Sequence, residues 1–88
     1  MRTKRFEDSG FITDSLDPIL YKVRLTLGDE GDTLTIYDSD IGVESGGEIA
    51  YLDADNPEVD FGVKGQRCFK GLYAYLPGSG SFYTTWED

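Results

Sequence analysis

Histidine is absent from the 88-residue sequence, and cysteine and methionine occur once each, as Cys68 and Met1. The absence of histidine excludes the side chain that serves most often as a general base and as a metal ligand. A single cysteine excludes an internal disulfide and a thiolate zinc site, and a thiol without a nearby base is typical of a buried apolar residue. We therefore expect a protein that is not an enzyme, with no catalytic residue, no metal site and no cofactor.

Long apolar runs are also absent. No run of about 18 apolar residues, the length that spans a bilayer, occurs in the chain, and the basic segment at residues 1–10 leads into no apolar segment. The sequence therefore predicts neither a signal peptide nor a membrane span, and we expect a cytoplasmic protein, located in the host cytoplasm if a phage encodes it. A chain of this length has the size of one domain, so we expect a single acidic β domain over residues 1–88.

Helical periodicity is missing as well, since no apolar pattern of helical spacing persists for three turns. Residues 19–27 instead alternate apolar and polar side chains, which is typical of a half-buried strand. Residues 28–32 are turn formers, and the alternation resumes in residues 33–38, so this pair predicts a β-hairpin. Residues 67–76 and 81–86 are rich in aromatic and β-branched side chains and predict a second, C-terminal hairpin.

Three more β-prone segments complete the expected fold. Residues 48–53 and 59–63 predict two short strands, separated by a turn at Asn56 and Pro57, and residues 6–13 predict an edge strand. Short strands joined by Gly, Asp and Pro turns are typical of antiparallel folds. We expect an all-β fold, a small single-domain antiparallel meander, barrel or sandwich of about five to six short strands.

The glycine-rich segment PGSGS, residues 77–81, lies between two aromatic runs. A phosphate-binding loop would need a following helix and usually a lysine, and neither is present, so the segment predicts a hairpin loop. The neighbouring aromatic residues suit either cross-strand core packing or a platform on which nucleic-acid bases stack, and these residues are Tyr73, Tyr75, Phe82, Tyr83 and Trp86.

Basic residues are missing from the middle of the chain. The net charge of −9 predicts repulsion of a nucleic-acid backbone, so we expect no direct binding of nucleic acid. Between Arg24 and Lys64 there is no Lys or Arg. The eleven carboxylates of this interval are the candidate partner-binding residues, and they are Asp29, Glu30, Asp32, Asp38, Asp40, Glu44, Glu48, Asp53, Asp55, Glu58 and Asp60.

Three of these carboxylate pairs have the spacing i, i+2. In a strand such pairs lie on one face, about 6.6 Å apart, and a row of negative charges at this spacing can stand in for a phosphate backbone. In size, acidity and lack of catalytic motifs the chain is similar to small phage-encoded inhibitors that mimic nucleic acid, including anti-restriction and anti-CRISPR proteins, a resemblance of composition that assigns no residue roles. We expect such an inhibitor, docked on the basic surface of a nucleic-acid-binding protein or complex. The three pairs are Asp38 with Asp40, Asp53 with Asp55, and Glu58 with Asp60.

Two other interpretations stay open. The acidity is incidental if the chain is a structural or assembly module, such as a small virion component, because carboxylates also keep small domains soluble. Residues 53–60 (DADNPEVD) carry oxygen ligands that suit a weak calcium-binding domain, although they lack the register of an EF-hand. Steep weakening of partner binding by salt would distinguish the inhibitor from the assembly module.

Overall fold

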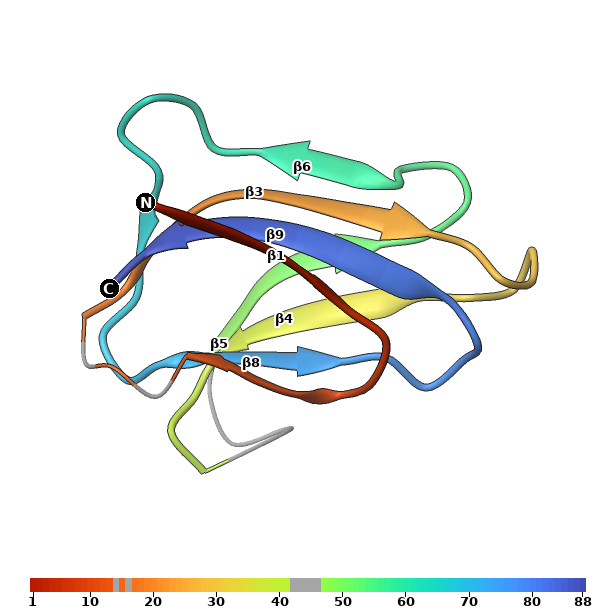
Figure 1. The fold of residues 1–88 in the computed structure, drawn as a ribbon, viewed down its shortest axis with the longest axis horizontal. Coiled ribbons are helices and arrows are strands. Elements are labelled where there is room, and N and C mark those ends of the chain that lie inside the picture. Colours follow the sequence, from red (N-terminus) through yellow and green to blue (C-terminus); the bar gives the residue numbers. More distant parts are fainter. Residues whose placement is uncertain (14, 16, 42–46) are drawn as a thin grey trace.

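The computed structural model describes residues 1–13, 15, 17–41 and 47–88, and these residues form nine β-strands and no helix (Figure 1). The all-β prediction is confirmed. The strands outnumber the five to six expected because the edge strand (β2) forms in addition to them, because β1 precedes it, and because a separate short strand, β7, precedes β8. Their bounds are β1 Arg2–Phe6, β2 Gly10–Thr13, β3 Ile19–Thr26, β4 Leu34–Asp38, β5 Gly47–Leu52, β6 Glu58–Asp60, β7 Gln66–Arg67, β8 Leu72–Tyr75 and β9 Ser81–Glu87.

The strands of the described residues form two antiparallel sheets. Sheet A has the order β1-β9-β3-β6, with β7 also paired to β3, and sheet B has the order β2-β8-β4-β5. Of the three architectures expected, the sandwich is the one that forms. None of the described residues belongs to a helix that is long and apolar enough to cross a membrane.

Neither predicted hairpin forms. β3 lies in sheet A and β4 in sheet B, while β8 lies in sheet B and β9 in sheet A. The segments between them, residues 27–33 and 76–80, are therefore crossovers from one sheet to the other. An alternating pattern shows which side of a strand is buried, but strands of either sheet can face the same core, so the pattern does not identify the partner strand. β3 pairs instead with β9, from Ile19 opposite Glu87 to Thr26 opposite Ser81.

The core lies between the sheets and follows from the alternation except at the start of β3, where the register shifts between Leu20 and Lys22. In β3, Leu20, Val23 and Leu25 are buried, and the inward side chains of sheet B pack against them. Phe82 of β9 is buried as well and stacks on Phe6 of β1 with ring centroids 5.1 Å apart. Each large apolar side chain of this kind contributes about 1.5–3 kcal/mol when fully buried, which is a large fraction of the stability of a small domain.

Cys68 is fully buried in this core, which confirms its interpretation as an apolar core residue. Burial, together with the negative charge of Asp38, raises the pKa of its thiol to about 12. A thiol with so high a pKa is protonated at neutral pH and is a poor nucleophile.

Candidate functional site

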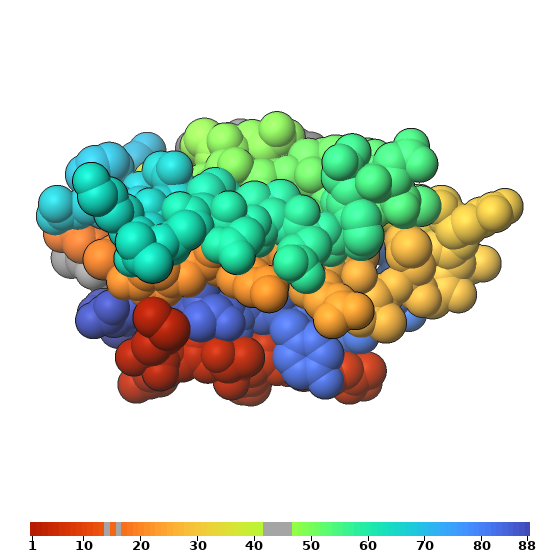
Figure 2. Space-filling model, turned by 90° about the horizontal axis from the view of Figure 1, so that it is seen from above, coloured from red at the N-terminus to blue at the C-terminus, as the bar shows by residue number. Residues whose placement is uncertain are grey.

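Four loops that cross between the sheets gather at one end of the sandwich, on the right of Figure 1. These loops, which we call the acidic end, are residues 7–9, 27–33, 53–57 and 76–80. Figure 2 shows residues 27–33, in yellow, projecting from this end. The strand pairing brings the loops together, because the strand residues next to the loops pair with one another. These pairs are Phe6 with Phe82, Thr26 with Ser81 and Leu34 with Leu52. The four loops contain no Lys or Arg but carry the carboxylates of Glu7, Asp8, Asp29, Glu30, Asp32, Asp53 and Asp55.

Asp32 is the buried carboxylate of the acidic end, with 5% of its surface exposed. Its Oδ2 accepts hydrogen bonds from the amides of Gly28 at 2.7 Å and Asp29 at 2.8 Å, and its Oδ1 accepts one from the amide of Ser79 at 3.2 Å. The Asp29 amide, followed by those of Gly28 and Ser79, lowers the pKa of Asp32 in spite of the opposing effect of burial. Asp32 therefore joins two loops and is turned away from any partner.

The glycine-rich segment 77–81 is the loop that receives Asp32. A Cβ atom on Gly78 would overlap Oδ1 of Asp32, and one on Gly80 would lie 2.5 Å from the carbonyl oxygen of Thr26. Glycine is needed at both positions because the loops approach so closely. The prediction of a hairpin loop was wrong, because the segment leads from sheet B to sheet A. It leads into β9, and no helix of a phosphate-binding loop follows it in the described residues.

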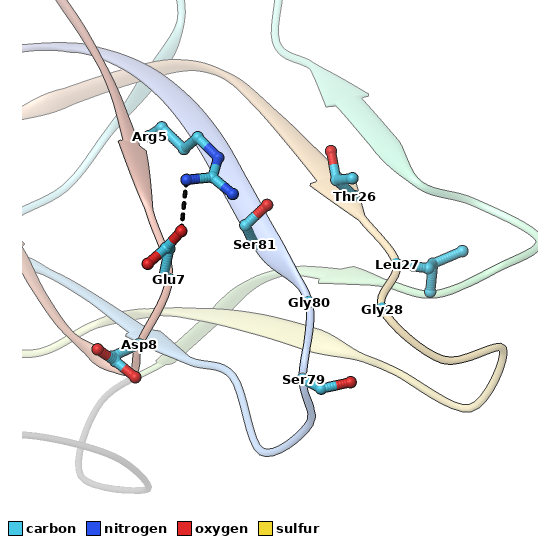
Figure 3. A pocket seen from close by; sticks show the side chains of 9 residues that line it. All are labelled: Arg5, Glu7, Asp8, Thr26, Leu27, Gly28, Ser79, Gly80 and Ser81. Atoms are coloured by element: carbon cyan, nitrogen blue, oxygen red, sulfur yellow. Dashed lines mark hydrogen bonds and ion pairs between the residues drawn. The ribbon is translucent and has the colours of Figure 1, made fainter.

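An open hollow of about 520 Å³ lies at the acidic end beside β1 and the start of β9 (Figure 3). Arg5 is the one cation in its lining, and Nη1 of Arg5 lies 2.6 Å from Oε1 of Glu7. The carboxylate of Asp8 adds a further negative charge to the rim. Because Glu7 already neutralises Arg5, the hollow favours a cationic or neutral group over an anion.

Asp53 shapes the third loop of the acidic end. Its Oδ1 accepts hydrogen bonds from the amides of Asp55 at 3.0 Å and Asn56 at 2.9 Å, the geometry of an Asx turn. The amide of Leu25 donates to the carbonyl of Pro57 at 2.7 Å and fixes the loop to β3. Asp55 is left exposed, like Glu7, Asp8, Asp29 and Glu30 in the other loops.

Asp38, at the end of β4, also accepts backbone hydrogen bonds. Its carboxylate accepts hydrogen bonds from the backbone amides of Phe69 at 3.0 Å, Lys70 at 2.8 Å and Gly71 at 3.3 Å. These contacts fix the turn that leads into β8. Asp38 is therefore held in the fold, and it does not form a surface row with its neighbour Asp40.

Glu58 and Asp60 lie in β6 and are the one predicted pair that shares the face of a strand within the described residues. They face cations across the sheet, because Asp60 is opposite Lys22 and Glu58 is opposite Arg24. Nζ of Lys22 lies 3.5 Å from Oε1 of Glu58. These two carboxylates are compensated in space although no cation accompanies them in the sequence.

The remaining predicted residues lie elsewhere. Asp40 and Glu48 are exposed at the opposite end of sheet B, close to where Asp38 pairs with Gly47. Glu44 lies outside the described residues. Of the ten predicted carboxylates that the structure describes, it thus brings Asp29, Glu30, Asp32, Asp53 and Asp55 together. The other five lie elsewhere, Asp38, Asp40 and Glu48 toward the opposite end of sheet B and Glu58 and Asp60 in β6.

Glu7 and Asp8 belong to the acidic end but are not among the residues predicted from the sequence. Three basic residues precede them in the chain, but only Arg5 contacts one of them, since Nε of Arg2 lies 3.2 Å from the carboxylate of Asp88. β1 joins the site because it pairs with β9, which is remote in sequence, so no local signal could have revealed this.

The cations are sorted between the two sheets. Six of the eight Lys and Arg residues lie in strands of sheet A, whose outer face is seen in Figure 2, and none lies in a strand of sheet B. The six are Arg2, Lys4, Arg5, Lys22, Arg24 and Arg67. The molecule thus has a cationic sheet, a sheet without cations, and an acidic end.

A metal centre is not assembled by the part of the chain that the structure describes, where no group of three Asp, Glu or Cys side chains could hold an ion. In residues 53–60, the segment considered for calcium, Oδ1 of Asp53 and Oδ1 of Asp60 instead accept backbone hydrogen bonds.

The fold and the site define a small two-sheet β domain with one acidic end. No protein-family model matches this chain, and neither a curated protein nor a solved structure does so.

Proposed function

We propose that the protein is a non-catalytic, cytoplasmic binding protein that docks through its acidic end on a basic protein surface, of the kind that normally holds nucleic acid. The observation that supports this most directly is the gathering of seven carboxylates, five of them exposed, in four loops at one end that contain no Lys or Arg. A patch of one sign attracts a partner of opposite sign and accelerates its association. Inhibition by mimicry of a phosphate backbone is the form of this function that we favour.

The exposed carboxylates of the acidic end are carried by a braced framework. Asp32 ties residues 27–33 to residues 76–80, and the Pro57 carbonyl ties residues 53–57 to β3. Loops held in this way present their charges with little loss of conformational entropy on binding, which favours affinity.

Replacing two exposed carboxylates of the acidic end by uncharged amides tests the proposal. The variant Asp29→Asn/Glu30→Gln and the control Asp17→Asn/Asp40→Asn each change the net charge by the same amount, but the control residues lie at the opposite end. The longest dimension of the molecule is 33 Å, several times the Debye length of about 8 Å at physiological salt, so charges at the far end are screened from the partner.

The partner is captured from a cell lysate with the parent protein, and its binding kinetics are then measured by surface plasmon resonance at low and high salt. We expect the acidic-end variant to bind about two- to thirtyfold more weakly, at about 0.2–1 kcal/mol per charge, chiefly through a slower on-rate. The control variant should bind like the parent. Equal losses in both variants, or no loss in either, would refute docking through the acidic end.

An assembly module is the second candidate function, and the exposed aromatic side chains of sheet B favour it. Phe11, Tyr51 and Tyr75 are each more than a third exposed. Apolar assembly contacts persist at high salt, whereas docking by the acidic end weakens steeply, so the salt series distinguishes the two functions.

A further inference from the structure

The outer face of sheet B carries two cross-strand rows of side chains. In one row Phe11, Tyr73 and Tyr37 lie side by side on β2, β8 and β4. In the other row Thr35 of β4 lies between Tyr75 of β8 and Tyr51 of β5. These are outward positions, because the residues that alternate with them belong to the core. We call the five aromatic residues of these rows the tyrosine face.

Three of the five rings of this face are exposed, and Tyr37 and Tyr73 are half-buried. Phe11 is 44% exposed, Tyr51 48% and Tyr75 39%, while Thr35 between the two tyrosines is only 7% exposed. The ring of Phe11 packs edge-on against that of Tyr73, with centroids 5.0 Å apart. Neighbouring strands lie about 4.8 Å apart, so in the first row a partner side chain meets adjacent rings. Tyr51 and Tyr75 lie two strands apart, about 9.6 Å, on either side of Thr35.

No strand of sheet B contains Lys or Arg, so the tyrosine face has no cation on its strands. Lys70, in the turn before β8, lines a small hollow together with Phe11 at the edge of the face. Elsewhere in the chain, cations lie over aromatic rings. Nζ of Lys4 lies 5.2 Å from the ring centroid of Phe6, and Cζ of Arg67 lies 5.6 Å from that of Phe69. The charged outward side chain of the face is Glu48, opposite Tyr37, and it adds negative potential.

We propose that the tyrosine face binds arginine side chains of a basic protein partner. The inference rests on the proposed function, because the same partner that engages the acidic end would extend onto this face, which adjoins it where Tyr51 is followed by Leu52 and Asp53. Guanidinium groups stack on aromatic rings and are less strongly hydrated than ammonium groups. The net charge of −9 disfavours two alternative occupants, nucleic acid and a second copy of the chain, because both are anionic.

The probes are two eight-residue peptides, in which Gly alternates with Arg in one and with Lys in the other. The first variant, Tyr51→Leu/Tyr75→Leu, removes two exposed rings without a change of charge, and Tyr51→Phe/Tyr75→Phe keeps the rings. Tyr83→Leu is the matched control, because Tyr83 is 46% exposed on the other sheet. Thermal melts confirm that each variant is folded, and calorimetric titration at fixed salt gives the Kd values.

We expect the parent to bind the arginine peptide more tightly than the lysine peptide, and the Leu double variant to lose about two- to fivefold in affinity for each ring. The Phe variant and Tyr83→Leu should bind like the parent. Amide resonances of residues 35, 51 and 75 should shift on titration in the NMR spectrum.

If the Leu double variant binds like the parent while Asp29→Asn/Glu30→Gln binds more weakly, the tyrosine face is not the binding site. That result would overturn this inference and would still support docking through the acidic end. Loss in neither variant would overturn both. A parent dimer in analytical ultracentrifugation that the Leu variant abolishes would show that a second copy covers the face, which also overturns the inference.

Discussion

Gly80 is the position at which the packing of the acidic end can be tested most directly. A Cβ atom there would lie 2.5 Å from the carbonyl oxygen of Thr26, whereas ordinary contacts begin near 3.4 Å, so the loop of residues 76–80 and the end of β3 would have to separate by roughly 0.9 Å. The carbonyl belongs to β3, which pairs with β9, and cannot move alone. Overpacking of this kind costs about 1–3 kcal/mol, so we expect Gly80→Ala to lower the Tm by about 5–20 °C.

Gly31→Ala is the matched control for this experiment. It lies in the same acidic end, but a Cβ atom there would meet nothing within 4 Å. Alanine reduces the freedom of the unfolded chain, so we expect a gain of about 0.4–1 kcal/mol and a small rise in Tm. The assay is thermal unfolding followed by circular dichroism for both variants. If Gly80→Ala melts with the parent, the close approach of residues 76–80 to β3 does not exist and the bracing of the acidic end is wrong.

Two further predictions concern carboxylates that accept backbone hydrogen bonds. Asp38→Ala leaves the amides of residues 69–71 without their acceptor and should cost about 1–3 kcal/mol in urea unfolding, whereas Asp40→Ala should be within about 0.5 kcal/mol of the parent. Equal stability of the two variants would contradict the role of Asp38. Because the pKa of Asp32 is lowered in the folded state, its contribution to stability is present above the ordinary aspartate pKa of about 4 and is lost as the pH falls through the folded-state pKa. Urea unfolding between pH 2 and 7 should therefore give a larger loss on acidification for the parent than for Asp32→Asn, and parallel profiles would contradict the anchoring role.

The class of fold could be predicted from the sequence, and the pairing of its strands could not. The alternation in residues 19–27 correctly indicated that Val23 and Leu25 face the core, since burial on one side is a local property. It placed Ile19 and Tyr21 on the same side, but the register shifts between Leu20 and Lys22, so Leu20 is buried and these two are only half-buried. Pairing depends on contacts between distant segments, such as β3 with β9, and a loop such as 27–33 suits a crossover as well as a hairpin. The predicted hairpins were wrong for this reason.

The candidate site could be predicted only in part, for the same physical reason. The excess of carboxylates in residues 29–60 was visible in the sequence, and the exposed Asp29, Glu30 and Asp55 are among them. Which carboxylates accept backbone hydrogen bonds depends on amides that are remote in sequence, as for Asp32 with Ser79 and Asp38 with Lys70. Cations are also brought close only by folding, as Lys22 is to Glu58.

Hydrogen bonds to backbone amides change the electrostatic argument for a partner. Eleven like charges in one segment oppose compaction, and in the sequence nothing nearby offsets them. In the structure, Asp32, Asp38, Asp53 and Asp60 each accept amide hydrogen bonds, and charge-assisted bonds of this kind are stronger than neutral ones. These four carboxylates therefore stabilise the free protein and need no partner.

The repulsion that a partner would relieve is confined to the exposed carboxylates without such contacts. At the acidic end these are Asp8, Asp29, Glu30 and Asp55, for which the described residues provide no hydrogen bond or ion pair to the side chain. Neutralising any of them removes repulsion without removing a contact, so it should leave the free protein as stable as before or slightly more stable while weakening the docked complex. This opposite effect on stability and binding separates a docking carboxylate from a structural one such as Asp38, whose replacement lowers stability first.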